Sequence, residues 1–287
     1  MSSPRGSPQG MHRWIEENKS SFVPPVCNKL MYGAGQLKVM FIGGPNVRKD
    51  YHMEEGEEIF YQVKGDMVLK IVEKGVHKDV TIKEGEIFVL PCRIPHSPQR
   101  FENTVGLVIE RERLDNETDG LRYYADRSTD ILWEEWFHCF DLGTQLGPVI
   151  KKFFASQEHA TGKLPEGKTF APPPFELDTT TSVMKPFDFN QWIKEHRSEF
   201  QTNTGKALFG KGEFEVVVLG EGIQQLSGKE TFLWQLEGET TLEYENGVTK
   251  VLKSDDVILI TAEERCTVKR SANSVGVSVI TNPLACK

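Results

Sequence analysis

The chain has 287 residues, of which 26% are charged and 38% are hydrophobic, an ordinary balance for a soluble globular protein. Its net charge of −8 argues against nucleic acid or an acidic membrane as a partner, because both bind to basic surfaces. No apolar run reaches membrane-spanning length. Five scattered cysteines without a C-x-x-C pair indicate neither a disulfide framework nor a structural zinc site, so we expect a cytosolic protein with reduced thiols.

The N-terminal half begins with Met1–Gly10, which is rich in Ser, Pro and Gly and predicts a flexible tail without a signal peptide. A helical segment follows at Trp14–Phe22. Short apolar runs punctuated by Gly, Pro and Asp then extend from about Leu37 to Arg111, a pattern typical of β-strands in a barrel. The aromatic-rich, partly helical segment Asp130–Phe154 is expected to pack against this barrel.

The C-terminal half repeats this order after a polar, Pro-rich stretch at residues 166–182, whose composition predicts a linker. A similar helical segment, Trp192–Phe200, precedes strand-like runs from about Phe214 to Ile280. Two further segments align in the same order, Tyr61–Gly65 with Trp234–Gly238 and Gly85–Pro91 with Asp255–Thr261. Such repeats in register predict a mostly β protein of two tandem barrels, each preceded by a short helix. We expect a catalytic domain at 1–165, a linker at 166–182 and a degenerate, metal-free domain at 183–287.

Three residues of the first copy, His52, Glu58 and His96, are the candidate metal ligands. Two imidazoles and one carboxylate suit a divalent transition metal and leave coordination positions open. The aligned residues of the second copy are not a plausible ligand set: Gln225, Thr231 and Cys266. One metal site, in the first copy, is therefore predicted. The other five histidines are expected to be surface or packing residues.

The ligands lie within two stretches that resemble the cupin motifs. Gly44-x5-Asp50-x-His52-x5-Glu58-x6-Gly65 is similar to the first motif, and Gly85-x5-Pro91-x-Arg93-x2-His96-x3-Arg100 is similar to the second. The chain departs from the pattern where Asp50 replaces the usual first His, where Arg93 replaces Gly and where Arg100 replaces Asn. The resemblance implies that both copies are cupin barrels, double-stranded β-helices of the jelly-roll kind.

The ligand set favours non-haem Fe(II) working with O₂, and zinc-dependent hydrolysis or isomerisation is the competing use of such a site. Arg48 and Arg100 lie close to the ligands in sequence, and Glu110 follows on a strand-like run. Two arginines near the mouth of a barrel indicate an anionic substrate, because a guanidinium binds a carboxylate well. The alternative is that both arginines are solvated or paired with acidic residues.

Several runs closely resemble the 3-hydroxyanthranilate 3,4-dioxygenase family, and the similarity extends over nearly the whole chain. These runs are Val26–Lys29, Phe41–His52, Pro95–Phe101, Asp119–Tyr124 and Asp141–Leu146. The degenerate second cupin is similar to the single-chain animal form of the family. Bacterial members carry a second iron on a pair of C-x-x-C motifs, which this sequence lacks.

The resemblance implies one Fe(2+) per chain on His52, Glu58 and His96. It implies opening of the ring of 3-hydroxyanthranilate with O₂ to 2-amino-3-carboxymuconate semialdehyde, the precursor of quinolinate and NAD in the kynurenine pathway. Arg100 would bind the substrate carboxylate, Glu110 would accept a proton, and Arg48 would stabilise negative charge on O₂.

The substrate site, the oligomeric state and an alternative function are the remaining expectations for this chain. Substrate is also expected at Glu58 and Asn28, with the loop Leu142–Leu146 closing over it. The second copy would cover the surface on which single cupins pair, which predicts a monomer. The alternative function is a non-oxygenase, metal-binding cupin that binds or isomerises a small anion, and iron content with O₂ uptake would separate the two.

Overall fold

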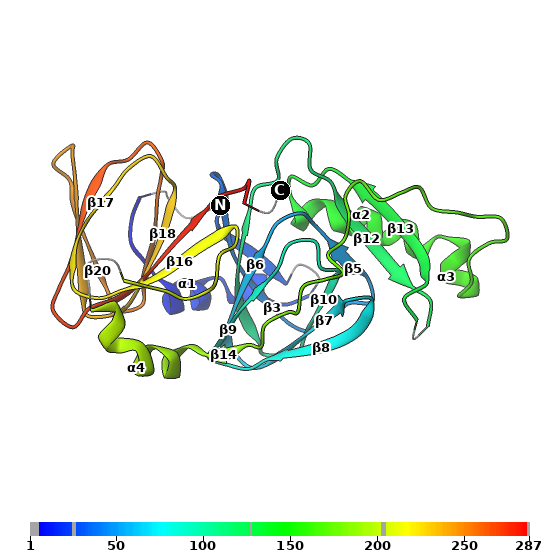
Figure 1. Ribbon diagram of the computed structural model, residues 1–287, viewed down its shortest axis with the longest axis horizontal. Coiled ribbons are helices and arrows are strands. Elements are labelled where there is room, and N and C mark those ends of the chain that lie inside the picture. Colours follow the sequence, from blue (N-terminus) through cyan, green and yellow to red (C-terminus); the bar gives the residue numbers. More distant parts are fainter. Residues whose placement is uncertain (1–5, 25–26, 127, 202–204, 286–287) are drawn as a thin grey trace.

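Two β-units lie side by side along the long axis of the protein, as the computed structural model shows (Figure 1). The structure describes residues 6–24, 27–126, 128–201 and 205–285. The predictions made for Met1–Arg5, Val26 and Cys286 concern residues outside these ranges. The second copy occupies one end of the molecule, and both ends of the described chain lie near the middle (Figure 1).

The first copy consists of two antiparallel sheets. One sheet has the strand order β14-β9-β6-β11-β3-β2, and the other has the order β13-β12-β5-β10-β7-β8, with β4 beside β10. The strands are β2 (Asn28–Tyr32), β3 (Leu37–Gly43), β4 (Asn46–Val47), β5 (Tyr51–Met53), β6 (Glu58–Lys64), β7 (Met67–Glu73), β8 (Val76–Ile82), β9 (Glu86–Leu90), β10 (His96–Arg100), β11 (Val105–Arg111), β12 (Asp119–Tyr124), β13 (Ile131–Phe137) and β14 (Phe187–Asp188).

The second copy repeats this plan with fewer strands. Its sheets have the orders β1-β21-β18-β23-β16-β15 and β17-β22-β19-β20. The strands are β1 (Gln9–Gly10), β15 (Lys206–Ala207), β16 (Phe214–Leu219), β17 (Gly222–Leu226), β18 (Thr231–Glu237), β19 (Glu239–Tyr244), β20 (Thr249–Lys253), β21 (Asp256–Ile260), β22 (Cys266–Arg270) and β23 (Val275–Thr281). The predicted tandem repeat of mostly β units is confirmed.

Each copy is preceded by a helix, α1 (Met11–Glu17, followed by the 3₁₀ turn Lys19–Ser21) and α4 (Phe189–Phe200), as predicted. The strand before each helix pairs with the other copy: β1 joins β21 and β14 joins β9. The first helical amides continue this exchange, since Met11 N donates to Asp255 O at 2.9 Å and Phe189 N donates to Gly85 O at 3.0 Å. The prediction of a flexible tail is therefore wrong for Gln9 and Gly10, because an apolar helix directly after them anchors them on β21.

A single hydrophobic cluster crosses from one copy to the other. Strand β3 alternates buried and partly exposed residues, and its buried side chains pack in the same cluster as β18, β21 and β23 of the second copy. Aromatic contacts join the copies, with ring centroids 5.1 Å apart for Tyr61 and Trp234 and 6.2 Å apart for Tyr32 and Phe232. Burial of apolar area is the main favourable term in such a contact. The division into 1–165, 166–182 and 183–287 stays a prediction.

The segment after β12 packs against the first copy, as predicted. It contains β13, α2 (Leu142–Phe154) and α3 (Gln157–Thr161), and the rings of Tyr123 and Phe153 stack with centroids 3.5 Å apart. The predicted loop Leu142–Leu146 is instead the first part of α2. The Asp141 side chain caps this helix by accepting a hydrogen bond from Gly143 N at 3.0 Å, which satisfies an amide that the helix itself leaves unpaired.

The cysteines do not all match the expectation of reduced thiols. Cys27, Cys139 and Cys266 are free and buried, but Cys92 is disulfide-bonded. Scattered spacing in the sequence could not reveal that pairing, because disulfide geometry depends on which chain segments meet in the fold. Within the described ranges, no helix has the length and apolar character needed to cross a membrane.

Candidate metal centre

Four buried side chains, His52, Glu54, Glu58 and His96, converge so that one ligand atom from each lies within 4.8 Å of the others. His52 on β5 and His96 on β10 are directly opposite each other in an antiparallel pair, with ring centroids 5.2 Å apart. Glu58 begins β6 on the other sheet and approaches from across the barrel. The structure thus brings together the three predicted ligands.

Glu54 is a possible fourth ligand that the sequence analysis missed. It comes two residues after His52, so an extended backbone places both side chains on one face, and that spacing was the available signal. Oε1 of Glu54 is buried without a hydrogen-bond partner, and Oε1 of Glu58 faces His96 Nε2 at 2.7 Å. Buried carboxylate oxygens are rarely left unpaired, so these atoms are suited to bind a cation.

The electrostatics of the cluster also fit a cation. Burial, together with the nearby charge of Glu110, raises the pKa of Glu58 to about 8, although a hydrogen bond with Glu54 and the charge of Arg113 oppose the rise. Burial likewise raises the pKa of Glu54 well above its usual range, and burial lowers the pKa of His96 to about 4. Neutral imidazoles and carboxylates that share a buried site are a suitable donor set for a divalent transition metal.

Each imidazole is oriented by a hydrogen bond at one of its ring nitrogens. His52 Nε2 is 2.7 Å from Asp119 Oδ2, and His96 Nδ1 is 3.0 Å from Ile94 O. His96 Nε2 then faces Glu58 Oε1 at 2.7 Å. A carboxylate or carbonyl behind each imidazole is the usual arrangement around a ligated metal, because it holds the ring in place.

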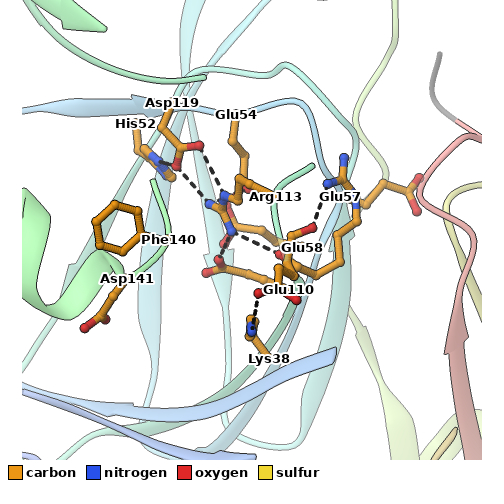
Figure 2. Close-up of polar contacts among 12 residues, drawn as sticks. Lys38, His52, Glu54, Glu57, Glu58, Glu110, Arg113, Asp119, Phe140 and Asp141 are labelled. Atoms are coloured by element: carbon orange, nitrogen blue, oxygen red, sulfur yellow. Dashed lines mark hydrogen bonds and ion pairs between the residues drawn. The ribbon is translucent and has the colours of Figure 1, made fainter. Parts of the chain in front are cut away.

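Arg113 connects the groups around the cluster and was also missed from the sequence (Figure 2). Its guanidinium lies 2.5 Å from Glu54 Oε2, 2.7 Å from Glu110 Oε2 and 3.0 Å from Asp119 Oδ2. Burial alone would lower the pKa of Arg113, but Glu54, Asp119 and Glu110 together raise it well above its usual range. In turn, Arg113 and His52 hold the pKa of Asp119 at about 2 against the effect of burial.

Arg48 lies beside the cluster but is paired. Its Nε donates to Asp50 Oδ2 at 2.9 Å, and its Nη2 contacts the same oxygen. Its positive charge acts on both Glu58 and His96. Asp50 stands at the position of the usual first cupin His. Its carboxylate forms an ion pair with Arg48, and it does not belong to the metal-binding group.

Arg100 is the least paired of the predicted site residues. Its side chain is only 1% exposed, Nη1 donates to Gln62 Oε1 at 3.1 Å, and Nε and Nη2 have no partner. Burial lowers its pKa to about 10, and the charge of Glu58 partly opposes this effect. A buried guanidinium with two unpaired nitrogens can bind a carboxylate in bidentate fashion.

A cavity of about 700 Å³ leads to this region from the surface. Glu110 and Arg113 line its inner part, and Asn28, Phe140 and Gly143 line it further out. Phe140 is 75% exposed and lies beside the cluster in the close-up (Figure 2). The cavity is large enough for an aromatic substrate. His138, expected to be a surface or packing residue, also borders this cavity.

The second copy has no comparable group of ligands. Cys266 on β22 is opposite Leu226 on β17, whereas the equivalent His96 is opposite His52. The alignment of His52 with Gln225 is therefore wrong by one residue, because the turn before β18 is one residue shorter. Within the part of the chain that the structure describes, His52, Glu54, Glu58 and His96 are the only group found that could hold a metal ion.

Comparison with known proteins identifies clear relatives. Residues 5–154 match the family model described as 3-hydroxyanthranilic acid dioxygenase. The chain is 55% identical over 278 residues to "3-hydroxyanthranilate 3,4-dioxygenase" of Nematostella vectensis, covering 96% of this chain and 100% of the relative. It is 50% identical over 281 residues to the human protein of the same name, covering 97% of each chain.

Among solved structures, the fold is similar to a "Cupin 2 conserved barrel domain protein from Leptotrichia buccalis". The TM-score is 0.51 at 11% sequence identity, and the alignment covers 98% of this chain and 100% of the other. At this identity the similarity concerns the fold alone, and it agrees with the two cupin barrels predicted from the sequence.

Proposed function

The chain belongs to the 3-hydroxyanthranilic acid dioxygenase family, and we propose that it opens the ring of 3-hydroxyanthranilate with O₂, using one Fe(2+) per chain. The product is 2-amino-3-carboxymuconate semialdehyde, the precursor of quinolinate and NAD. The observation that carries the proposal is the buried cluster of His52, Glu54, Glu58 and His96. Arg113, which pairs with Glu54 of this cluster, also lines the cavity.

His52, Glu58 and His96 are the proposed iron ligands. Two imidazoles and one carboxylate are the donor set of non-haem iron oxygenases, and the coordination positions left open accept substrate and O₂. When bound, Fe(2+) supplies the electron transfer that couples an electron-rich aromatic ring to O₂. The alternative of a non-oxygenase cupin has no comparable support, since both relatives described above carry the dioxygenase name.

The other predicted residues bind and orient the substrate in this proposal. Arg100 takes the carboxylate of 3-hydroxyanthranilate, because Nε and Nη2 lack partners inside the protein. Glu110 accepts the proton from the substrate hydroxyl or amino group, and Arg113 holds its carboxylate at 2.7 Å. Arg48 provides positive charge for O₂. Asn28 and the first turn of α2 cover the substrate from the outer side of the cavity.

We also propose that the protein is a cytosolic monomer without nucleic-acid or membrane partners. Sheets of the two copies already contact each other through one hydrophobic cluster, which supports a monomer, since that surface is where single cupins would pair. Sedimentation of the purified chain at micromolar concentration tests this expectation.

The ring-opening reaction can be tested directly. An anaerobic sample of the chain loaded with Fe(2+) and 3-hydroxyanthranilate should form the absorbing semialdehyde when air is admitted, with one O₂ consumed per product. The metal-free chain and the Zn(2+)-loaded chain serve as controls and should form none. Product formation that is equal in all three samples, or absent from the iron sample, would contradict the proposal.

A further inference from the structure

The turn between β5 and β6 carries two metal-centre carboxylates among four acidic residues. Its sequence is Glu54-Glu55-Gly56-Glu57-Glu58. Four carboxyl groups in one short turn repel one another whenever they are ionised, so the shape of the turn depends on partners elsewhere. Glu54 contacts Arg113, Glu55 accepts from Arg93 Nη2 at 3.1 Å, and Glu58 faces His96.

The fourth acid, Glu57, binds the second copy through Glu213, the residue immediately before β16. Glu57 N donates to Glu213 Oε2 at 2.9 Å. In return, Glu213 N and Phe214 N donate to Glu57 Oε2 at 2.7 and 2.9 Å. These three hydrogen bonds hold the main chain beside the proposed ligand Glu58 against the start of β16 in the second copy.

Glu213 also holds the other side of the metal centre, through Arg111. Glu213 Oε1 forms an ion pair with Arg111 Nε, and Arg111 Nη2 donates to Glu117 Oε1 at 2.7 Å. Arg111 and Glu117 are each two residues before a member of the Arg113–Asp119 pair. Two ion pairs therefore join the same two segments. The outer pair, Arg111–Glu117, lies beside the second copy, and the inner pair, Arg113–Asp119, lies beside the proposed ligands.

Gly56 lies where the outer and inner groups meet. A Cβ atom there would be 3.3 Å from Glu213 Oε2, 3.6 Å from Arg111 Nε and 3.6 Å from Glu54 Oε2. The carboxylate from the second copy and the carboxylate of the metal-binding group thus both lie within 4 Å of this one position. Glu213 is 1% exposed and Arg111 is also 1% exposed, so water does not screen this arrangement.

We infer that Glu213, supplied by the metal-free second copy, is a positioning residue for the metal centre of the first copy. It holds the turn so that Glu54 and Glu58 face the imidazoles, and through Arg111 and Glu117 it holds the segment that carries Asp119. The inference depends on the proposed function only in taking the cluster to be an iron site. It gives the second copy a function, since the carboxylate that closes the network belongs to the residue immediately before β16.

The main test is Glu213→Gln in the full chain. The amide keeps the shape of the side chain but removes the charge that pairs with Arg111. We expect Fe(2+) affinity, measured by competition with a chelator, to fall by about tenfold, as for residues that support metal ligands indirectly. The visible spectrum of the Co(2+)-substituted chain should also change, and hydrogen exchange at residues 54–58 should accelerate in the metal-free chain.

Glu230→Gln is the matched control. Glu230 is likewise a carboxylate of the second copy that binds the first, because its Oε1 accepts a hydrogen bond from Leu37 N at 2.6 Å, but that contact lies on β3 and not on the turn. This variant should keep the parent's iron affinity and Co(2+) spectrum. An equal loss of affinity in both variants would overturn the inference, because any weakening of the contact between the copies would then suffice.

A second variant protects the test against misfolding, because an unpaired buried arginine is strongly destabilising. The combined replacement of Arg111→Met, Glu117→Gln and Glu213→Leu removes all three charges of this buried group and keeps packing, and such replacements are often tolerated. It should fold and show the same weakened iron binding. Affinity within about twofold of the parent, with an unchanged Co(2+) spectrum, would overturn the inference. A parent chain that binds no iron would instead contradict the proposed function.

Discussion

The two copies share one strand plan but carry different side chains at equivalent interior positions. In the first copy His52, Glu58 and His96 meet around buried carboxylates. In the second copy Cys266 belongs to an apolar cluster with β19, β20 and β21, and it is opposite Leu226. A barrel of this kind therefore needs no ligands to fold, and the buried charges of the first copy serve a purpose other than stability.

The arginine at the end of the equivalent strand shows the same difference. Arg100 in the first copy leaves Nε and Nη2 without partners. Arg270 in the second copy uses its Nε for a hydrogen bond to Gly220 O at 2.7 Å and its Nη1 for one to Gln224 Oε1 at 3.3 Å. The same residue type is thus available for a ligand in one barrel and largely tied to the protein in the other.

The largest expected effect is the loss of iron when a proposed ligand of the first copy is replaced. His96→Ala should lose iron and activity while the chain stays folded, because a ligand at the barrel mouth contributes little to the core. The matched variant Cys266→Ala, at the equivalent position, should keep one iron per chain and near-normal activity. Elemental analysis and circular dichroism check both. Two tightly held metals in the parent chain, or an unfolded His96→Ala chain, would contradict the assignment.

The arginine comparison predicts the next largest effect. Arg100→Ala should weaken binding of 3-hydroxyanthranilate by about 2–5 kcal/mol, because the carboxylate then enters a dry site without its partner. Binding of 2-aminophenol, which has the chelating groups but no carboxylate, should stay about the same. Arg270→Ala should change neither affinity. If Arg100→Ala weakened both ligands equally, its guanidinium would shape the site and Arg48 would become the candidate for the carboxylate.

Glu110 has an apolar counterpart on the equivalent strand, Ile280, so its role can be tested in the first copy alone. Glu110→Gln should retain iron and lose turnover by roughly a hundredfold, the usual contribution of a general base. Stopped-flow formation of the semialdehyde measures the loss, and iron content is the control. Near-normal turnover of this variant across neutral pH would remove Glu110 from the mechanism.

The smallest expected effect is the pH dependence of metal binding. The raised pKa of Glu58, about 8, means that its carboxyl is protonated at pH 7 in the metal-free chain, and a metal must displace that proton. Affinity should therefore fall as pH decreases from 8 to 6, by roughly tenfold per pH unit in the lower part of that range. His96, with a pKa of about 4, stays neutral and adds no slope. Chelator competition at pH 6, 7 and 8 measures the effect, and an affinity independent of pH would contradict it.

Much of the site was predictable because its ligands lie in local patterns. His52, Glu58 and His96 stand at motif spacings around turns, and the repeat of helix and strands is visible in the residues themselves. Arg100 ends the second of these motifs, and Glu110 follows on the strand-like run after it. Asn28 and the start of α2 border the cavity. The segment from Leu142, predicted as a loop, is helical and is capped by Asp141.

The sequence by itself predicted the repeat, the mostly β fold and the three candidate ligands, since each is visible in local patterns of residues. The tertiary structure decided which further groups surround them. Asp119 reaches the cluster through the pairing of β5 with β12, and Arg113 follows β11, which pairs with β6. The exchange of β1 and β14 between the copies depends on their packing. Glu57 meets Glu213 across 156 residues of sequence. Such contacts arise from strand register and from the shared hydrophobic cluster, which no local pattern encodes.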